Sequence, residues 1–130
     1  MKSYKLINNS EEYHEFIRNL RNDERVKSGF IQTEYITSEQ QQEYMKKFGS
    51  CFYICLIDEK PAGYIGVIDN DIRIATHPDY QKMGVAKFML EKICELFPKA
   101  QAKIKIENEA SLKLFKSMGY KIKYFLLEKE

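Results

Sequence analysis

The sequence has few of the residues that build metal centres or disulfide frameworks. Its 130 residues include three cysteines and two histidines. The cysteines, Cys51, Cys55 and Cys94, lie within apolar strand or helix patterns. With only His14 and His77 as further ligands, they show no spacing typical of a metal site. We therefore expect no metal, and we interpret the cysteines as reduced core residues rather than as catalytic thiols.

The chain also lacks a long apolar run and a strong excess of one charge. No run of about eighteen apolar residues occurs, and Met1–Lys5 offers no signal-peptide hydrophobic stretch, so we expect a cytoplasmic protein without a membrane partner. The formal net charge of +2 gives no reason to expect a nucleic-acid partner, although it suits an anionic cofactor. The composition, 44% hydrophobic and 31% charged, is that of a globular protein. We expect residues 1–130 to form one domain.

One stretch near the middle of the chain combines a strand, a turn and a helix start. Ile72, Ile74 and Thr76 alternate as in a strand, and Pro78, which has no N–H to donate, predicts that the strand has ended by then. Apolar residues then recur at helical steps from Gly84 onward. The first N–H groups of a helix lack partners and attract anions, and small residues at this point leave room for a ligand.

Two motifs resemble those of one enzyme family. The spacing Gln-x-x-Gly-x-Ala over residues 81–86 resembles the acyl-coenzyme-A pyrophosphate loop of the GNAT superfamily of N-acetyltransferases. It is not a Walker loop, because no Lys-Ser/Thr pair follows the glycine, and it lacks the three-glycine dinucleotide fingerprint. The family's closing motif is similar to a second stretch, in which Asn108 follows a predicted strand and caps a short helix that ends at Gly119.

The predicted order of elements, β-α-α-β-β-β-α-β-α-β, matches the order in that superfamily. It implies an α+β fold in α/β/α layers, with a mixed, mostly antiparallel sheet of about six strands and about four helices. Asn9 and Glu12 predict a capping box for the first helix, Thr37 or Ser38 caps the second, and Gly63 and Gly66 predict a bulge or a close backbone approach. The expected strands cover residues 3–7, 51–57, 62–68, 71–76, 102–107 and 120–127.

The resemblance implies acetyl-CoA as cosubstrate and a set of residues that bind it. The backbone N–H of Ile74 would stabilise the acetyl oxygen as negative charge develops on it, and Thr76 would pair with the pantetheine amide. Asn108 would contact the pantetheine arm, and residues 81–86 would hold the pyrophosphate. The complete implied set is Ile74, Thr76, Gln81, Lys82, Met83, Gly84, Val85, Ala86, Asn108, Ser111 and Phe115.

Transfer to an amine also requires a base for the amine and a proton for the leaving thiolate. Deprotonating a lysine at pH 7 costs roughly 4.6 kcal/mol and an α-amino group roughly 1.4 kcal/mol, so a weakly basic acceptor asks less of the protein. Many family members are thought to protonate the thiolate with a tyrosine where this chain has Phe115, which leaves Ser111, Tyr120 or water for that step. The candidate bases, acting directly or through water, are Glu34, Asp69, Asp71 and Glu107.

The acceptor is the least determined part of the hypothesis. In the family the loop between the first two helices faces the acceptor, which makes Arg21, Asn22 and Arg25 candidates for substrate binding. Asn-x-x-Ser at residues 108–111 together with Phe115 resembles the branch of ribosomal-protein N-terminal and amino-sugar acetyltransferases. We therefore expect an amino sugar, first of all a nucleotide-linked one, with a protein N-terminus or a small amine as the alternative. Two alternatives that are not enzymes stay open, a non-catalytic acyl-CoA binding module and a nucleotide-binding regulator. A homodimer also stays open.

Overall fold

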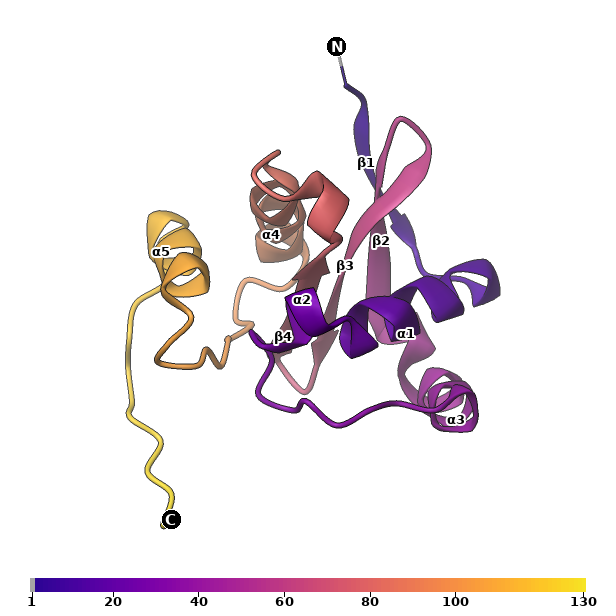
Figure 1. The fold of residues 1–130 in the computed structure, drawn as a ribbon. Coiled ribbons are helices and arrows are strands. Elements are labelled where there is room, and N and C mark those ends of the chain that lie inside the picture. Colours follow the sequence, from indigo (N-terminus) through magenta and orange to yellow (C-terminus); the bar gives the residue numbers. More distant parts are fainter. Residues whose placement is uncertain (1) are drawn as a thin grey trace.

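The protein, described as a computed structural model over residues 2–130, contains a four-stranded antiparallel sheet (Figure 1). Its strands lie in the order of the chain: β1 (Tyr4–Asn8), β2 (Phe52–Ile57), β3 (Lys60–Ile68) and β4 (Asp71–Thr76). Two-residue turns join β2 to β3 and β3 to β4, and the central residues of both turns have positive φ, as a right-twisted hairpin requires. The predicted turns at residues 58–61 and 69–71 are thus confirmed.

Five α-helices and three short 3-10 helices complete the chain. The α-helices are α1 (His14–Asn22), α2 (Glu24–Lys27), α3 (Ser38–Phe48), α4 (Val85–Leu96) and α5 (Glu109–Ser117). The 3-10 helices are η1 (Glu11–Tyr13), η2 (Gly49–Cys51) and η3 (Pro78–Tyr80). None of the helices within residues 2–130 has the length and apolar character needed to traverse a membrane.

Side-chain capping explains where α3 begins, and one predicted cap is wrong. Thr37 and Gln40 form a capping box at the start of α3, as predicted. The predicted Asn9 cap is absent, because Ser10 is the N-cap residue of η1. The Asn9 side chain is directed elsewhere, and its Nδ2 donates to the Gly49 carbonyl at 3.1 Å.

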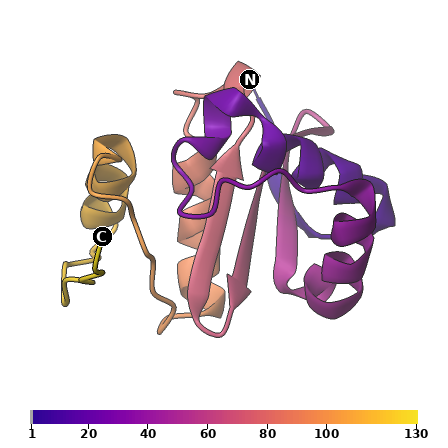
Figure 2. The same cartoon turned by 60° about the horizontal axis from the view of Figure 1, so that its bottom comes forward.

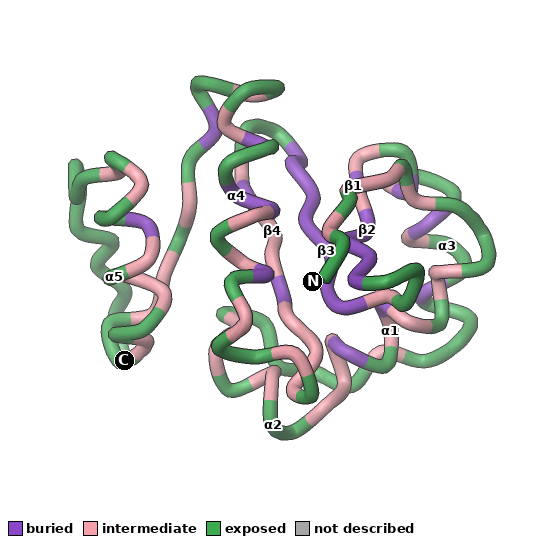
Figure 3. The backbone as a smooth tube through the Cα atoms, turned by 90° about the horizontal axis from the view of Figure 1, so that it is seen from above, coloured by how far each residue is buried: buried purple, intermediate pink, exposed green. Residues whose placement is uncertain are grey.

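Helices cover both faces of the sheet and create two apolar cores (Figure 2). On one face Ile17, Leu20 and Met45, from α1 and α3, pack against Ile54 and Tyr64. On the other face, residues of α4 pack against inward residues of β2 and β3, namely Met89, Leu90, Ile93, Cys55 and Ile65. Because β2 and β3 are covered on both sides, nearly all their residues are buried (Figure 3), which explains their unbroken apolar sequence.

The two glycines of β3 serve different purposes. The register between β2 and β3 shifts at Cys55 and Leu56, which oppose Gly63 and Pro61, so the predicted bulge is confirmed. At Gly66 a Cβ would lie 2.6 Å from the ring of Phe52, and the glycine therefore allows a close approach to the aromatic side chain.

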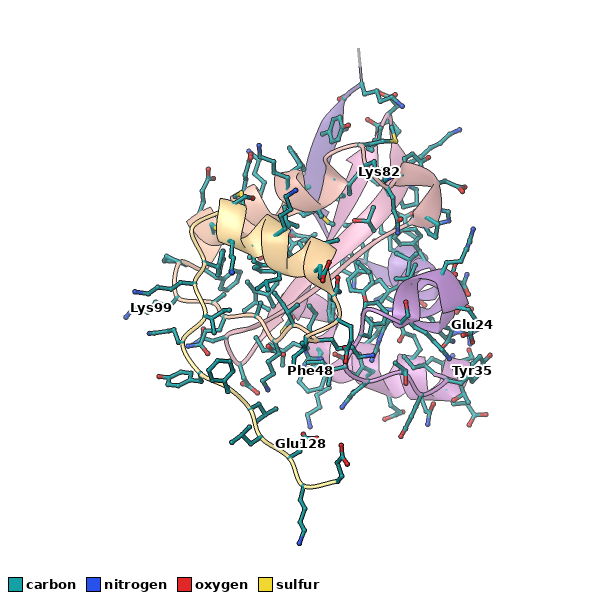
Figure 4. All side chains as sticks on the ribbon, turned by 60° about the vertical axis from the view of Figure 1, so that its left-hand side comes forward. Glu24, Tyr35, Phe48, Lys82, Lys99 and Glu128 are labelled. Carbon is teal, nitrogen blue, oxygen red and sulfur yellow. The ribbon has the colours of Figure 1, made fainter. Side chains whose placement is uncertain are left out.

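Two predicted strands are not formed, and the expectation of six strands is wrong. Residues 102–107 leave the sheet after one parallel bridge between Asp71 and Gln101, and residues 121–130 run as an exposed, extended tail past Glu128 (Figure 4). A strand requires a neighbour for its backbone N–H and C=O groups, and neither segment has one along its length. The exposure of their side chains is consistent with the lack of a neighbouring strand, since Ile106 is 91% exposed and Leu127 is 89% exposed. The number of α-helices, five, also exceeds the predicted four.

Candidate active site

The outer edge of β4 carries backbone N–H groups that are not directed at β3. The His77 N–H donates to β3, whereas the Ile72 N–H donates at 2.8 Å to the carbonyl of Gln101 on the opposite side. N–H directions alternate along a strand, so the N–H groups of Ile74 and Thr76 point away from β3, as that of Ile72 does. Among residues 2–130, the hydrogen bonds across this edge end at Ile72, because the chain diverges from β4 after Gln101. The result is a wedge, which we define as the space between β4 and residues 102–107.

The chain then turns sharply into α4, and two left-handed residues make the turn. Lys82 has φ of 63° and Gly84, the N-cap residue, has φ of 78°. No side chain caps α4 and no acidic residue lies in its first turn. The first bond of the helix runs from the Phe88 N–H to the Gly84 carbonyl, so the N–H groups before Phe88 are available to an anion.

The loop before α4 is held in place from β1. The Tyr4 hydroxyl donates to the Met83 carbonyl at 2.6 Å, and the Tyr4 ring lies 5.6 Å from that of Phe88. Within the loop, Gln81 and Lys82 are exposed, whereas Val85 is buried in the core and offers only its backbone to a ligand. Figure 4 shows Lys82 at the end of the molecule where β1 begins, far from the C-terminal tail.

Asn108 caps α5 as predicted and also approaches the loop after α2. Its Oδ1 accepts from the Ser111 N–H at 3.1 Å, and its Nδ2 lies 3.5 Å from the carbonyl of Gly29. Ser111 is half-buried in the first turn of α5. Asn108, which is predicted to contact the pantetheine arm, therefore lies where residues 105–108 meet the rest of the fold.

Phe115 lies in the apolar core, where it helps to end α5. The Tyr120 N–H donates to the Phe115 carbonyl and the Gly119 N–H to that of Lys116, which is a Schellman motif with Gly119 at φ of 93°. The rings of Phe115 and Tyr120 meet edge to face at 5.1 Å. Burial, and a hydrogen bond with Cys94 at 3.1 Å, raise the pKa of Tyr120. Phe115 and Tyr120 thus act here as packing residues.

The four candidate bases occupy different environments. Asp71 accepts from the Arg73 Nε at 2.8 Å and starts β4, about 10 Å along the strand from Ile74. Asp69 is exposed in the turn before it. Glu107 is exposed immediately before the N-cap of α5. Glu34 lies on the connection between α2 and α3, which crosses in front of the sheet in Figure 2.

A groove of about 470 Å³ lies between α1, α3 and that connection. Its lining includes Arg21, Glu34, Gln40 and Tyr44. The Arg21 guanidinium lies over the Tyr44 ring, with its carbon 4.8 Å from the ring centroid, which is a cation–π contact. The groove therefore combines a cation, a carboxylate and an aromatic face.

The other two predicted substrate residues are engaged within the protein. Asn22 uses both ends of its amide on the backbone of Ile36, donating to the carbonyl and accepting from the N–H at 2.8 Å each. Arg25 pairs with Asp23 at 2.8 Å, and this contact holds the pKa of the Asp23 carboxyl down to about 2. Of the three, Arg21 alone lines the groove.

Sequence reasoning missed Tyr44, Tyr4 and Lys105. No local pattern indicates that Arg21 would stack on Tyr44. Tyr4 and Lys105 act on loops 79 and 77 residues distant in sequence, which no spacing rule detects. Within the described residues 2–130, no group of three or more His, Cys, Asp or Glu side chains is placed to hold a metal ion.

Comparison with known protein families finds a match. Residues 14–120 match the model of the acetyltransferase (GNAT) family. No curated protein sequence matches the chain.

Solved structures share the fold at low sequence identity. A spermidine N-acetyltransferase from Vibrio cholerae, in complex with CoA and spermine, is 16% identical with a TM-score of 0.81, over 97% of this chain and 85% of that one. A domain from Methanocaldococcus jannaschii is 17% identical with a TM-score of 0.81, over 93% of this chain and 90% of that one. A ribosomal-protein-alanine N-acetyltransferase from Brucella melitensis is 14% identical with a TM-score of 0.75, over 88% of this chain and 83% of that one.

Proposed function

The chain belongs to the acetyltransferase (GNAT) family, and we propose that it transfers the acetyl group of acetyl-CoA to the primary amine of an amino sugar, first of all a nucleotide-linked one. The observation that carries the catalytic part of this proposal is the outward direction of the Ile74 and Thr76 N–H groups at the open edge of β4. An N–H fixed in a strand can stabilise an oxyanion without reorganising.

Acetyl-CoA fits the wedge with its pyrophosphate at the start of α4 and its thioester near Ile74. The start of α4 favours the pyrophosphate. Its uncapped N–H groups and the exposed Lys82 supply positive potential, and Gly84 leaves space for the ligand. Thr76 lies between Ile74 and the start of α4 along the chain, at the position expected for the pantetheine amide. Asn108 and Ser111 face the arm from the other side in this proposal.

The groove supports an acceptor that carries negative charge. Arg21, whose guanidinium lies over the Tyr44 ring, offers a cation for a phosphate, while Glu34 can accept a proton from the amine. Asp71 is less suited to be the base because Arg73 already holds its carboxylate. Glu107 would act from the opposite side, through water.

Acetyl transfer begins when the amine nitrogen attacks the thioester carbon. A C–N bond forms, and the oxyanion accepts from the Ile74 N–H. Glu34 takes the amine proton, directly or through water. The C–S bond breaks as the carbonyl re-forms. The thiolate, whose thiol pKa is about 8.5, takes a proton relayed through Ser111 or water, and the proton held by Glu34 passes to solvent, which restores the relay group. The packing of Phe115 and Tyr120 against each other favours Ser111 or water for this last step.

A protein N-terminus or a small amine is the second candidate acceptor. The fold is shared with a ribosomal-protein-alanine N-acetyltransferase and with a spermidine N-acetyltransferase, so the architecture accommodates both classes. A polyamine would be expected to meet several carboxylates, whereas the lining of the groove contains one carboxylate, Glu34, together with the cation of Arg21. This charge balance favours the anionic acceptor.

The test is the release of free coenzyme A from acetyl-CoA with a panel of amino sugars, nucleotide-linked amino sugars, N-terminal peptides and polyamines. We expect the highest kcat/KM with a nucleotide-linked amino sugar, and we expect Arg21→Met to raise its KM more than that of the free amino sugar. Glu34→Gln should lower kcat by about tenfold or more, whereas Glu43→Gln on the outer side of α3 should not. A clear preference for polyamines or peptides would overturn the acceptor assignment.

A further inference from the structure

The connection that carries Glu34 is fastened at both of its ends by side chains. At its far end, Asn22 binds both backbone polar groups of Ile36, and the Arg18 Nη1 donates to the same carbonyl at 3.0 Å. Both of these residues belong to α1, which forms one wall of the groove. This end is therefore fixed within the acceptor half of the fold.

The near end is fastened from the cofactor half. The Lys105 Nζ donates to the Ser28 carbonyl at 3.1 Å, and the Asn108 Nδ2 approaches the Gly29 carbonyl at 3.5 Å. The approach is close enough that a Cβ on Gly29 would lie 3.0 Å from the Asn108 Nδ2. Lys105 and Asn108 follow the segment that diverges from β4, so they belong to the far wall of the wedge.

The two carbonyls are available to side-chain donors. They follow α2, a helix of four residues, and no backbone N–H among residues 2–130 donates to either of them. Lys105 supplies a charged donor. Lys105 is half-buried, so its side chain has less rotational freedom than that of an exposed lysine. Lys103, two residues earlier, is exposed and has no hydrogen-bond or ion-pair partner among residues 2–130.

We propose that Lys105 is a positioning residue for the acceptor, because it fastens the start of the 28–37 connection to the wall of the cofactor wedge and so fixes the groove, with Glu34, relative to the thioester. This inference rests on the proposed function, since it assigns the groove to the acceptor. Lys105 itself touches neither reacting atom. Loss of the contact would loosen the near end of the connection and leave the far end held by Asn22 and Arg18.

The experiment compares Lys105→Met with Lys103→Met, which removes a charge from the same segment without removing the contact, and with Lys105→Arg, which retains a donor. Steady-state kinetics with acetyl-CoA and the best acceptor of the panel should show the acceptor KM raised by about three- to tenfold in Lys105→Met, the loss expected for one ordinary hydrogen bond, since this bond is exposed to solvent. The KM for acetyl-CoA should change less than twofold. Lys103→Met and Lys105→Arg should resemble the parent protein.

Hydrogen exchange in the absence of substrates gives a second measurement that does not depend on turnover. The amides of residues 30–35 should exchange faster in Lys105→Met than in Lys103→Met, while those of β2 and β3 remain equally protected. Equal acceptor KM and equal exchange in the two methionine variants would overturn the role of Lys105. Altered exchange without turnover on any amine would instead refute the proposed function, while the role of Lys105 in holding the 28–37 connection would stand.

Discussion

Gly84→Glu is the substitution that most directly tests where coenzyme A binds. Gly84 has φ of 78°, and a Cβ built there would meet no atom within 4 Å, so the side chain fits and only the backbone is strained. That strain costs about 1–2 kcal/mol of folding stability for a residue other than glycine. A carboxylate near a bound pyrophosphate adds repulsion of roughly 1–4 kcal/mol per charge pair at 4 Å, depending on the local dielectric.

Two alanine variants separate these effects. Gly84→Ala carries the same strain without the charge, and Gly119→Ala carries strain at φ of 93°, also in open space, at the distant end of α5. All three variants should lower the free energy of unfolding by a similar amount. Coenzyme A affinity, measured by isothermal titration calorimetry, should fall by about tenfold or more between Gly84→Ala and Gly84→Glu, and Gly119→Ala should bind normally.

The result that refutes this reasoning is equal coenzyme A affinity of Gly84→Ala and Gly84→Glu. It would mean that the start of α4 does not hold the pyrophosphate. A fall in affinity that is equal in all three variants would attribute the loss to general destabilisation instead.

Three further predictions concern stability and titration. Gly66→Ala should destabilise the protein by about 1–3 kcal/mol in chemical denaturation, because its Cβ would overlap the Phe52 ring, and a neutral result would show that the ring can move aside. Burial raises the pKa of the Cys55 thiol to about 11, so this cysteine should resist alkylation at pH 8 in the native protein and react after denaturation; peptide mass spectrometry that found rapid native labelling would contradict the burial. The pKa of Asp23 is depressed to about 2 by its hydrogen bonds with Arg25, so its stabilising contribution should be present above pH 4 and lost as the pH falls toward 2; an ordinary carboxyl pKa in an NMR titration would rule out the contact.

Much of the site could be predicted because its parts are local in sequence. The alternation at Ile72, Ile74 and Thr76 predicted the strand over these residues. The small residue at Gly84 marked the left-handed start of α4, and Asn108 and Gly119 marked the two ends of α5. In each case a few neighbouring residues are sufficient, because backbone conformation and capping depend on contacts within one or two turns.

The predictions that were wrong depended on partners elsewhere in the chain. The patterns at 102–107 and 120–127 are typical of strands, yet a strand forms only where another segment satisfies its backbone groups. The Asn9 side chain, expected to cap a helix, instead donates to the Gly49 carbonyl, 40 residues distant. Local propensity is a weak preference that tertiary contacts can override.

The sequence alone therefore determined the family resemblance and the central strand-turn-helix unit. Only the tertiary structure decided that Arg21 would stack on Tyr44, that Arg73 would occupy Asp71, and that Lys105 would reach across 77 residues to Ser28. The physical reason is that a backbone N–H is directed by its own strand or helix. A side chain is committed by whichever partner the fold brings within hydrogen-bonding distance.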